Sequence, residues 1–342
     1  MAGHDTQSRT PKLAIDSVVL GPMKQETPKY DQVSQILCVG DMVVDLFVHP
    51  ISRLPRAGEL IMTDKIEVFP GGNALNTAIA LGRLGEKVAM AGSIGGDALG
   101  GLLLDQLEAL GLDCQGITTE PSGTTASTVL FRVKGQDRRY VHSLGVAGDF
   151  DGKQIPWDLI PQGGIVLIGG YLKLAAWDDE TLIDFLRQAR KQQCVTVLNV
   201  CFARNSAVDP KRCLRLLEHV DVFAPNEDEA QAIAGQIELK QQATVLHEAG
   251  AGCVVITRGE RGVYAYDGDR IIERDVFPVS VVDPSGCGDC FTAGLISGLK
   301  RGWAFERVLE FGCAVGALGA TAMGCTNGVP SFESVERFIK ER

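Results

Sequence analysis

The chain has 342 residues, and 45% of them are hydrophobic, which suffices for the core of one large or two medium domains. Its net charge is −10 and no run is rich in Lys and Arg, so neither nucleic acid nor an anionic membrane is expected as a partner. No apolar stretch approaches the roughly 20 residues that span a bilayer, and no export signal is recognisable, which predicts a soluble, cytoplasmic protein.

Ten cysteines are spread along the chain, most of them isolated in apolar or helical segments, as at Cys38 and Cys313. This distribution is typical of reduced, buried thiols rather than of a disulfide framework. Cys287 and Cys290 form one Cys-x-x-Cys pair, but no second pair completes a zinc site. Because a helix N-terminus lowers the pKa of a thiol, Cys287 is predicted to be unusually reactive.

Residues 1–33 contain three prolines and no sustained hydrophobic period, which predicts a flexible N-terminal extension. Residues 35–40 then have the pattern of a buried first strand, and Asp41 and Asp45 follow it with two carboxylates. Because ligands of open α/β sheets bind outside the carboxyl ends of strands, these carboxylates are candidates for ligand contact.

Two segments, residues 45–70 and 122–145, are predicted to form a small β lid. Residues 61–69 alternate weakly enough for an exposed strand, and the Thr- and Val-rich residues 124–142 have the pattern of a hairpin. Arg138, Arg139 and His142 in this hairpin are candidates to reach a ligand beneath the lid, and Arg139 is the preferred one.

The rest of the chain alternates short apolar runs with helical patterns. This alternation predicts a doubly wound, mainly parallel sheet flanked by helices, the α/β class. No interior linker divides it, so residues 34–342 are predicted to form one domain. Strands are expected at residues 87–93, 165–168, 195–200, 221–224 and 253–257, and helices at 98–110, 180–192, 210–219 and 305–323. A further helix is expected to open within residues 70–78 and to run to about residue 84.

Residues 283–291 carry the strongest chemical signal. A strand-like run at residues 279–282 leads into a glycine-rich turn, and a helical pattern follows over residues 291–299. The free N–H groups of a helix's first turn and its macrodipole favour an anion, and glycines let that anion approach the backbone closely. Asp289 lies in this turn, where a carboxylate can take a proton from a hydroxyl while the N–H groups hold a phosphoryl group. The pattern predicts a phosphotransferase.

This loop resembles the Asp-Thr-x-Gly-Ala-Gly-Asp signature of the ribokinase-like (PfkB) carbohydrate kinases. Asp283, Gly286 and Gly288-Asp289 match it, and Cys287 replaces the alanine. Five further segments, at residues 71–76, 92–100, 226–229, 257–262 and 325–330, resemble segments of the same family in the same order. The resemblance therefore extends over nearly the whole chain beyond the N-terminal extension. It implies the ribokinase-like fold with a small β lid, and a kinase that uses ATP and Mg²⁺.

On the sugar side, Gly71-Gly72-x-x-x-Asn76 resembles the family segment that grips the sugar. Asp45 matches the aspartate that binds a substrate hydroxyl. The resemblance therefore implies that backbone and amide groups of Gly71, Gly72 and Asn76 bind sugar hydroxyls. It also implies dimerisation through the lid strands.

On the nucleotide side, an Asn-x-x-Glu segment ends in Glu229, which the resemblance links to Mg²⁺, bound largely through water. Asp283 lies near a monovalent cation in some members, so activation by K⁺ is a further hypothesis. The candidate contacts to ATP are Asn199, Asn226, Thr257, Gly259, Gly262, Gly286 and Gly288.

Together these patterns predict ATP-dependent phosphorylation of a hydroxymethyl group on a small sugar; ribose, fructose, another ketose and a keto-deoxy sugar acid all stay open. Asp289 would be the general base, and the N–H groups of Gly286, Cys287 and Gly288 would steady the transferring charge. A nucleoside kinase of the same family is the alternative, although only 6% aromatic residues argues against an aromatic platform for a base. The second alternative is a non-catalytic, sugar-binding regulatory protein, which would need neither Asp289 nor the magnesium signature.

Overall fold

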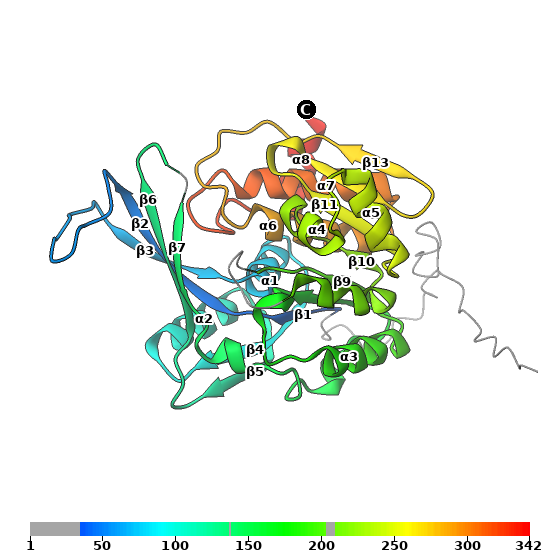
Figure 1. Cartoon of the computed structure of the whole chain (residues 1–342), viewed down its shortest axis with the longest axis horizontal. Helices are drawn as coiled ribbons and strands as arrows, with labels where there is room; N and C mark the ends of the chain where they lie inside the picture. The colour runs from blue at the N-terminus through cyan, green and yellow to red at the C-terminus, as the bar shows by residue number, and fades with distance from the viewer. Residues whose placement is uncertain (1–34, 137, 203–208) are drawn as a thin grey trace, which may run out of the picture.

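The computed structural model describes residues 35–136, 138–202 and 209–342 (Figure 1). The predicted extension, residues 1–33, lies outside the described residues. The rest folds into a large sheet covered by helices and a second, smaller sheet that stands to one side of it (Figure 1).

The large sheet has nine described strands in the order β13-β12-β11-β10-β9-β8-β1-β4-β5. All neighbours from β5 to β11 are parallel, and β12 is antiparallel to both β11 and β13. The mainly parallel sheet is therefore confirmed. The strands are β1 (Ile36–Gly40), β4 (Val88–Gly95), β5 (Asp113–Glu120), β8 (Ile165–Gly169), β9 (Val195–Leu198), β10 (Val222–Phe223), β11 (Cys253–Thr257), β12 (Val263–Tyr266) and β13 (Ile271–Arg274).

Helices cover both faces of this sheet because successive strand residues point to opposite sides. In β1, Ile36 and Cys38 pack into one apolar cluster, while Leu37 and Val39 pack into the other. The first cluster includes α1 (Asn73–Arg83), α2 (Ala98–Ala109), α6 (Cys287–Lys300), α7 (Phe305–Gly319) and α8 (Phe332–Lys340). The second includes α3 (Asp179–Lys191), α4 (Glu227–Ala234) and α5 (Leu239–Glu248). This is the predicted doubly wound arrangement.

The small sheet has the order β3-β2-β6-β7. It lies within the segments predicted for the lid, except for Val43 and Val44 at the start of β2 and Gly71 at the end of β3. β2 follows β1 after two residues, so the chain passes directly from one sheet to the other. β2 pairs antiparallel with β3 and parallel with β6, and β6 pairs antiparallel with β7. The four strands are β2 (Val43–Ile51), β3 (Ile66–Gly71), β6 (Ala126–Val133) and β7 (Arg139–Ser143).

The strand predicted at residues 279–282 is wrong. Val281 and Val282 are exposed, and the segment has no regular structure. Its backbone hydrogen bonds run elsewhere, since the N–H groups of Val282 and Asp283 both donate to the carbonyl of Ala320. Prolines at positions 278 and 284 flank the run and cannot donate to a strand ladder.

Two predicted helix bounds shift by four residues, and one predicted α-helix takes another form. α6 begins at Cys287, four residues before the predicted start, so Asp289 lies inside its first turn. α7 ends at Gly319 rather than at residue 323. Residues 210–219 form two short 3-10 helices, η5 (Pro210–Arg215) and η6 (Leu217–His219), instead of an α-helix.

Candidate active site

Polar residues converge at the carboxyl edge of the large sheet. Asp41 follows β1, Asn199 follows β9, Asn226 follows β10, and Thr257 ends β11. Lys173 ends the short 3-10 helix η4 (Tyr171–Lys173), which follows β8. In open α/β sheets this edge is where ligands bind, so the positions predicted from strand ends are brought together here.

Asp289 is the central carboxyl group of this edge and is only 7% exposed. Both of its oxygens accept side-chain amides from α1, Oδ1 from Asn73 at 3.0 Å and Oδ2 from Asn76 at 2.8 Å. Burial raises the pKa of Asp289 to about 7, although the Asn76 hydrogen bond opposes the rise; the negative charge of Asp41 adds to it. A carboxyl group with this pKa can accept a proton near neutral pH.

The N-terminus of α6 forms an open cradle beside Asp289. Gly286 caps the helix with φ +72°, and a Cβ there would lie 2.5 Å from the Cβ of Cys325. At Gly288, by contrast, a Cβ would meet no atom within 4 Å. The Cys290 N–H donates to the Gly286 carbonyl, and the amides before it belong to the first turn, which has no intrahelical acceptors. The space above them suits an anion.

Asp283 organises the loop that leads into this cradle. Its Oδ1 accepts the Ser285 N–H at 3.1 Å and the Ser285 hydroxyl at 2.8 Å, and its Oδ2 accepts the Gly324 N–H at 3.2 Å. Arg138 reaches the same loop from the small sheet, with Nη1 2.6 Å from the Ser285 oxygen and 3.7 Å from Asp283 Oδ1. The loop is thereby tied both to the segment after α7 and to the small sheet.

The small sheet presents a second polar row above the edge. Asp45 pairs with Thr128 across β2 and β6, and Thr128 pairs with His142 across β6 and β7. The Thr128 hydroxyl lies 3.0 Å from His142 Nδ1. Burial raises the pKa of Asp45, against the lowering effect of the Thr128 hydrogen bond. At Gly71, a Cβ would lie 2.2 Å from Asp45 Oδ2, so only glycine leaves room for this carboxyl group.

Asp41 occupies the start of α1. Its Oδ1 accepts the Ala74 N–H at 3.2 Å, and its Oδ2 lies 2.5 Å from Lys173 Nζ. Gly72 precedes the helix with φ +93°, and its Cβ would lie 2.5 Å from the Asp41 carbonyl oxygen. Gly71 and Gly72, the two glycines predicted to bind sugar, therefore also let the backbone approach Asp45 and Asp41 closely.

Asn226 and Glu229 form a capping box at the start of α4. The Glu229 N–H donates to Asn226 Oδ1 at 2.9 Å, and Glu229 Oε2 accepts the Asn226 N–H at 2.8 Å. Burial raises the pKa of Glu229 to about 7, and the charge of Asp289 adds to this rise. Within the described ranges, no three His, Cys, Asp or Glu side chains are close enough to hold a metal ion by themselves.

The remaining nucleotide candidates lie beside this capping box. Asn226 and Thr257 form an isolated parallel bridge. Asn199 donates to the Ala224 carbonyl at 3.3 Å, while its own Oδ1 is buried with no described partner. Gly262 has φ +75°, and its Cβ would lie 1.9 Å from the Arg274 carbonyl oxygen. Gly259 also has a positive φ, at +58°, in the turn after β11.

The structure places the two neighbouring arginines of the hairpin differently. Arg139, the predicted substrate contact, is exposed and donates to Gln136 Oε1 at 2.5 Å. Arg138 instead reaches Ser285. The sequence carries no signal that distinguishes them, because strand alternation sends neighbours to opposite faces and the register is set by the sheet. Lys173 was not predicted from the sequence, since it lies in a turn outside every recognised segment.

The predicted low pKa of Cys287 is wrong. Burial raises the pKa of this thiol to about 11, and the charge of Asp283 adds to the rise. A helix N-terminus favours the thiolate, but acidic neighbours and loss of water oppose ionisation here. Every cysteine in the described part of the chain is a free thiol, so the Cys287/Cys290 pair forms no disulfide.

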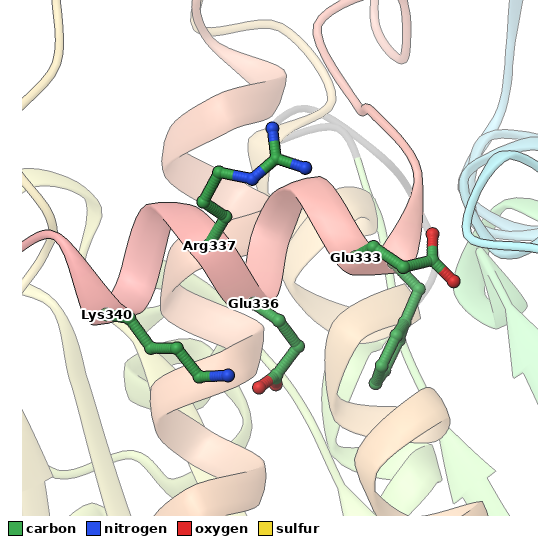
Figure 2. Close-up of a pocket in the computed structure, with 5 residues that line it drawn as sticks. Glu333, Glu336, Arg337 and Lys340 are labelled. Carbon is green, nitrogen blue, oxygen red and sulfur yellow. The ribbon is translucent and has the colours of Figure 1, made fainter.

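Two hollows lie outside this carboxylate cluster. One, of about 350 Å³, is lined by Phe332 and four charged side chains, all from α8. Figure 2 shows Arg337 pointing to one side of that helix, and Glu336 and Lys340 to the other. The second, of about 400 Å³, is lined mainly by residues of β4, β5 and the 3-10 helix η2 (Gly145–Asp149). Neither contains a residue of the site described above. Within the described residues, no helix is long and apolar enough to cross a membrane.

Comparison with known proteins gives a consistent result. The model of the pfkB family carbohydrate kinases matches residues 33–331. Ribokinase of Bacillus subtilis (strain 168) is 28% identical over 306 residues, which cover 89% of this chain and 99% of the ribokinase. A 5-dehydro-2-deoxygluconokinase of Photobacterium profundum is 28% identical and covers 80% of this chain, with 86% of its own length matched.

Among solved structures, Arabidopsis thaliana ribokinase complexed with ribose and ATP has a TM-score of 0.76 and 22% identity, with 90% of this chain and 99% of that chain covered. This similarity confirms the ribokinase-like fold. The family model spans both sheets, α1 with its two asparagines, and the Asp289 loop. The chain belongs to the pfkB family of carbohydrate kinases and is a phosphotransferase.

Proposed function

We propose that the protein phosphorylates a hydroxymethyl group of a small sugar, such as ribose, fructose or a related sugar, with ATP as the donor and Asp289 as the general base. One observation carries the proposal. Asp289 is buried beside the anion cradle of α6, its pKa is near 7, and its two oxygens are aligned by Asn73 and Asn76. A proton acceptor and an anion site thus share one helix turn.

In this reaction, Asp289 accepts the hydroxyl proton while the sugar oxygen forms a bond to the γ-phosphorus. The bond between that phosphorus and the β,γ-bridging oxygen breaks, and ADP leaves. The N–H groups of Gly286, Cys287 and Gly288 stabilise the charge on the transferring group. No covalent enzyme intermediate is needed.

The sugar would lie between the small sheet and α1. Asp45 is the acceptor for a sugar hydroxyl, and backbone groups of Gly71 and Gly72 lie beside it. Asn76 donates its amide to Asp289, but its Oδ1 is buried and has no described partner. A buried amide oxygen without a hydrogen bond is costly, so a sugar hydroxyl donating to it would satisfy the site.

ATP would extend from the α6 cradle toward Asn226 and Thr257, with Asn199, Gly259 and Gly262 as further contacts. Asn199 Oδ1 is a second buried acceptor without a described partner on this path. Mg²⁺ supplies charge neutralisation to the phosphates when bound, and Glu229 would hold it mainly through water, since Mg²⁺ gives up its waters reluctantly. Asp283 is the proposed neighbour of an activating K⁺.

The test is ADP release from MgATP with pentoses, hexoses, keto-deoxy sugar acids and nucleosides, with Asp289→Asn measured in parallel. Turnover of one sugar, lost by orders of magnitude in Asp289→Asn, supports the proposal. Turnover of nucleosides alone makes the chain a nucleoside kinase. Heat stabilisation by a sugar without any turnover makes it a sugar-binding protein instead.

We also propose that two copies associate through the outer face of the small sheet. On the face opposite Asp45, Val68, Leu46, Val129 and Val141 form one row across all four strands. Val141 is 64% exposed, which is unusual for an aligned apolar row. A second copy of the same row is its best complement. Sedimentation equilibrium should show a dimer that Val141→Glu dissociates and Ile237→Glu, at an exposed position elsewhere, does not; a monomeric wild type would refute it.

A further inference from the structure

Asp41 is tied to the helix that holds the proposed base. It is only 2% exposed, its Oδ1 accepts the Ala74 N–H, and its carbonyl accepts the Leu75 N–H at 3.4 Å. The same first turn of α1 supplies Asn73 and Asn76, which bind the two oxygens of Asp289. A negative charge is therefore fixed beside Asp289, and it raises the pKa of Asp289.

Lys173 supplies the compensating charge. Its Nζ lies 2.5 Å from Asp41 Oδ2, and its side chain is only 20% exposed. Burial opposes the ammonium form, but the charge of Asp41 overrides it and raises the pKa of Lys173 above its ordinary value. Lys173 is therefore a cation at every pH at which the enzyme would be assayed.

The charge of this ammonium acts on ionisable groups from five other segments. Its charge lowers the pKa of all five: Asp45 of β2, His142 of β7, Cys201 after β9, Glu229 of α4 and Asp289 of α6. Two of them carry little charge near neutral pH, since burial raises the pKa of Cys201 to about 11 and lowers the pKa of His142. What remains around Lys173 is a cluster of carboxyl groups, which repel one another when ionised.

We propose that Lys173 is a positioning residue of the kinase reaction: anchored by Asp41, its ammonium offsets the carboxylates around Asp289 and so lets Asp289 ionise and accept the substrate proton near neutral pH. This inference rests on the proposed function, in which Asp289 is the base. Lys173 itself need not touch the sugar or the transferring phosphoryl group.

The proposal predicts opposite effects for its two members. Lys173→Met leaves Asp41 uncompensated, so the pKa of Asp289 should rise by about one unit or more, as expected for loss of a nearby opposite charge. Asp41→Asn leaves Lys173 uncompensated, so the pKa of Asp289 should fall. The double variant Lys173→Met/Asp41→Asn removes both charges and should return it close to the wild-type value, and Lys173→Arg should preserve it.

The first measurement is the pH dependence of kcat/KM, whose acidic limb reports the base of the free enzyme. We expect the limb to move to higher pH in Lys173→Met, to lower pH in Asp41→Asn, and to stay in place in Lys173→Arg and in the double variant. A purely structural role would reduce the rate by the same factor at every pH. That result, or limbs that move in the same direction in both single variants, would overturn the proposal.

The second measurement does not depend on activity. The carboxyl carbon of Asp289, assigned by its absence in Asp289→Asn, is titrated by ¹³C NMR in each ligand-free variant. An unchanged titration of Asp289 in Asp41→Asn overturns the proposal even if Lys173→Met does not fold. If Asp289 titrates as expected but Asp289→Asn keeps full activity, the proposed base is wrong while the electrostatic effect of Lys173 stands.

Discussion

Replacing Asp289 with asparagine should remove activity and, at alkaline pH, make the protein more stable. The substitution keeps the size of the side chain. The new amide also has an acceptor available, because Asn76 Oδ1 is buried without a described partner and that amide can turn to receive an N–H. We therefore expect Asp289→Asn to fold and to lose about 10²- to 10⁴-fold in kcat, the usual contribution of a general base.

The stability gain follows from the raised pKa. In the folded protein the pKa of Asp289 rises from 3.8 to about 7, so folding binds a proton between these values. A raised pKa in the folded state contributes stability that is complete below about pH 4 and is lost as the pH rises through about 7. At about 1.4 kcal/mol per pKa unit, the loss is on the order of 4 kcal/mol. Asparagine cannot ionise, so Asp289→Asn does not lose this stability as the pH rises.

The assay is urea denaturation of both proteins, without ligands, at about pH 4, pH 5.5 and pH 8. The quantity of interest is the difference in free energy of unfolding between variant and wild type, because the other titrating groups largely cancel in it. Between the lowest and the highest pH, this difference should shift in favour of Asp289→Asn by roughly 4 kcal/mol.

Two results would contradict this reasoning. If the free energies of unfolding of the two proteins change in parallel with pH, Asp289 does not titrate in the folded state as its burial requires. If Asp289→Asn keeps its stability gain and also its turnover, Asp289 is a buried acid without a role as the base.

Three further predictions use the same geometry. Gly288→Ala should keep the wild-type midpoint of unfolding, because the new methyl group meets no atom within 4 Å. The same methyl group should fill the anion cradle and lower kcat about tenfold or more. A normal kcat would place the phosphoryl group elsewhere. Arg138→Ala removes the contact to Ser285 and should raise KM for the sugar. Arg139 is exposed, so Arg139→Ala should leave KM for the sugar within about twofold of the wild type. Equal effects of the two variants would exclude the Ser285 contact as the cause. Glu229→Gln should raise the Mg²⁺ concentration for half-maximal rate severalfold with little change in the sugar KM, and an unchanged Mg²⁺ dependence would remove Glu229 from the metal site.

The fold class and the outline of the site could be predicted from local patterns. Strand and helix periods reveal which side chains face a core, and the glycine-rich turn before α6 predicts an anion site from its local pattern. The ordered signatures then predicted the family, which the match over residues 33–331 confirms. The run at residues 279–282 shows the limit of this approach, because an apolar segment becomes a strand only when a partner strand accepts its hydrogen bonds.

Sequence by itself thus determined the α/β architecture, the lid segments and the position of Asp289 in a glycine-rich turn where a helix begins. Only the tertiary structure determined its neighbours. Asn73 binds Asp289 across 216 residues of chain, and Lys173 meets Asp41 from a turn with no recognisable pattern. Ionisation also depended on the fold, since burial and nearby charges raise the pKa of Cys287 where its position on the helix predicted a fall. The physical reason is that pKa values and ion pairs depend on distance and solvent exposure, which no local stretch of residues contains.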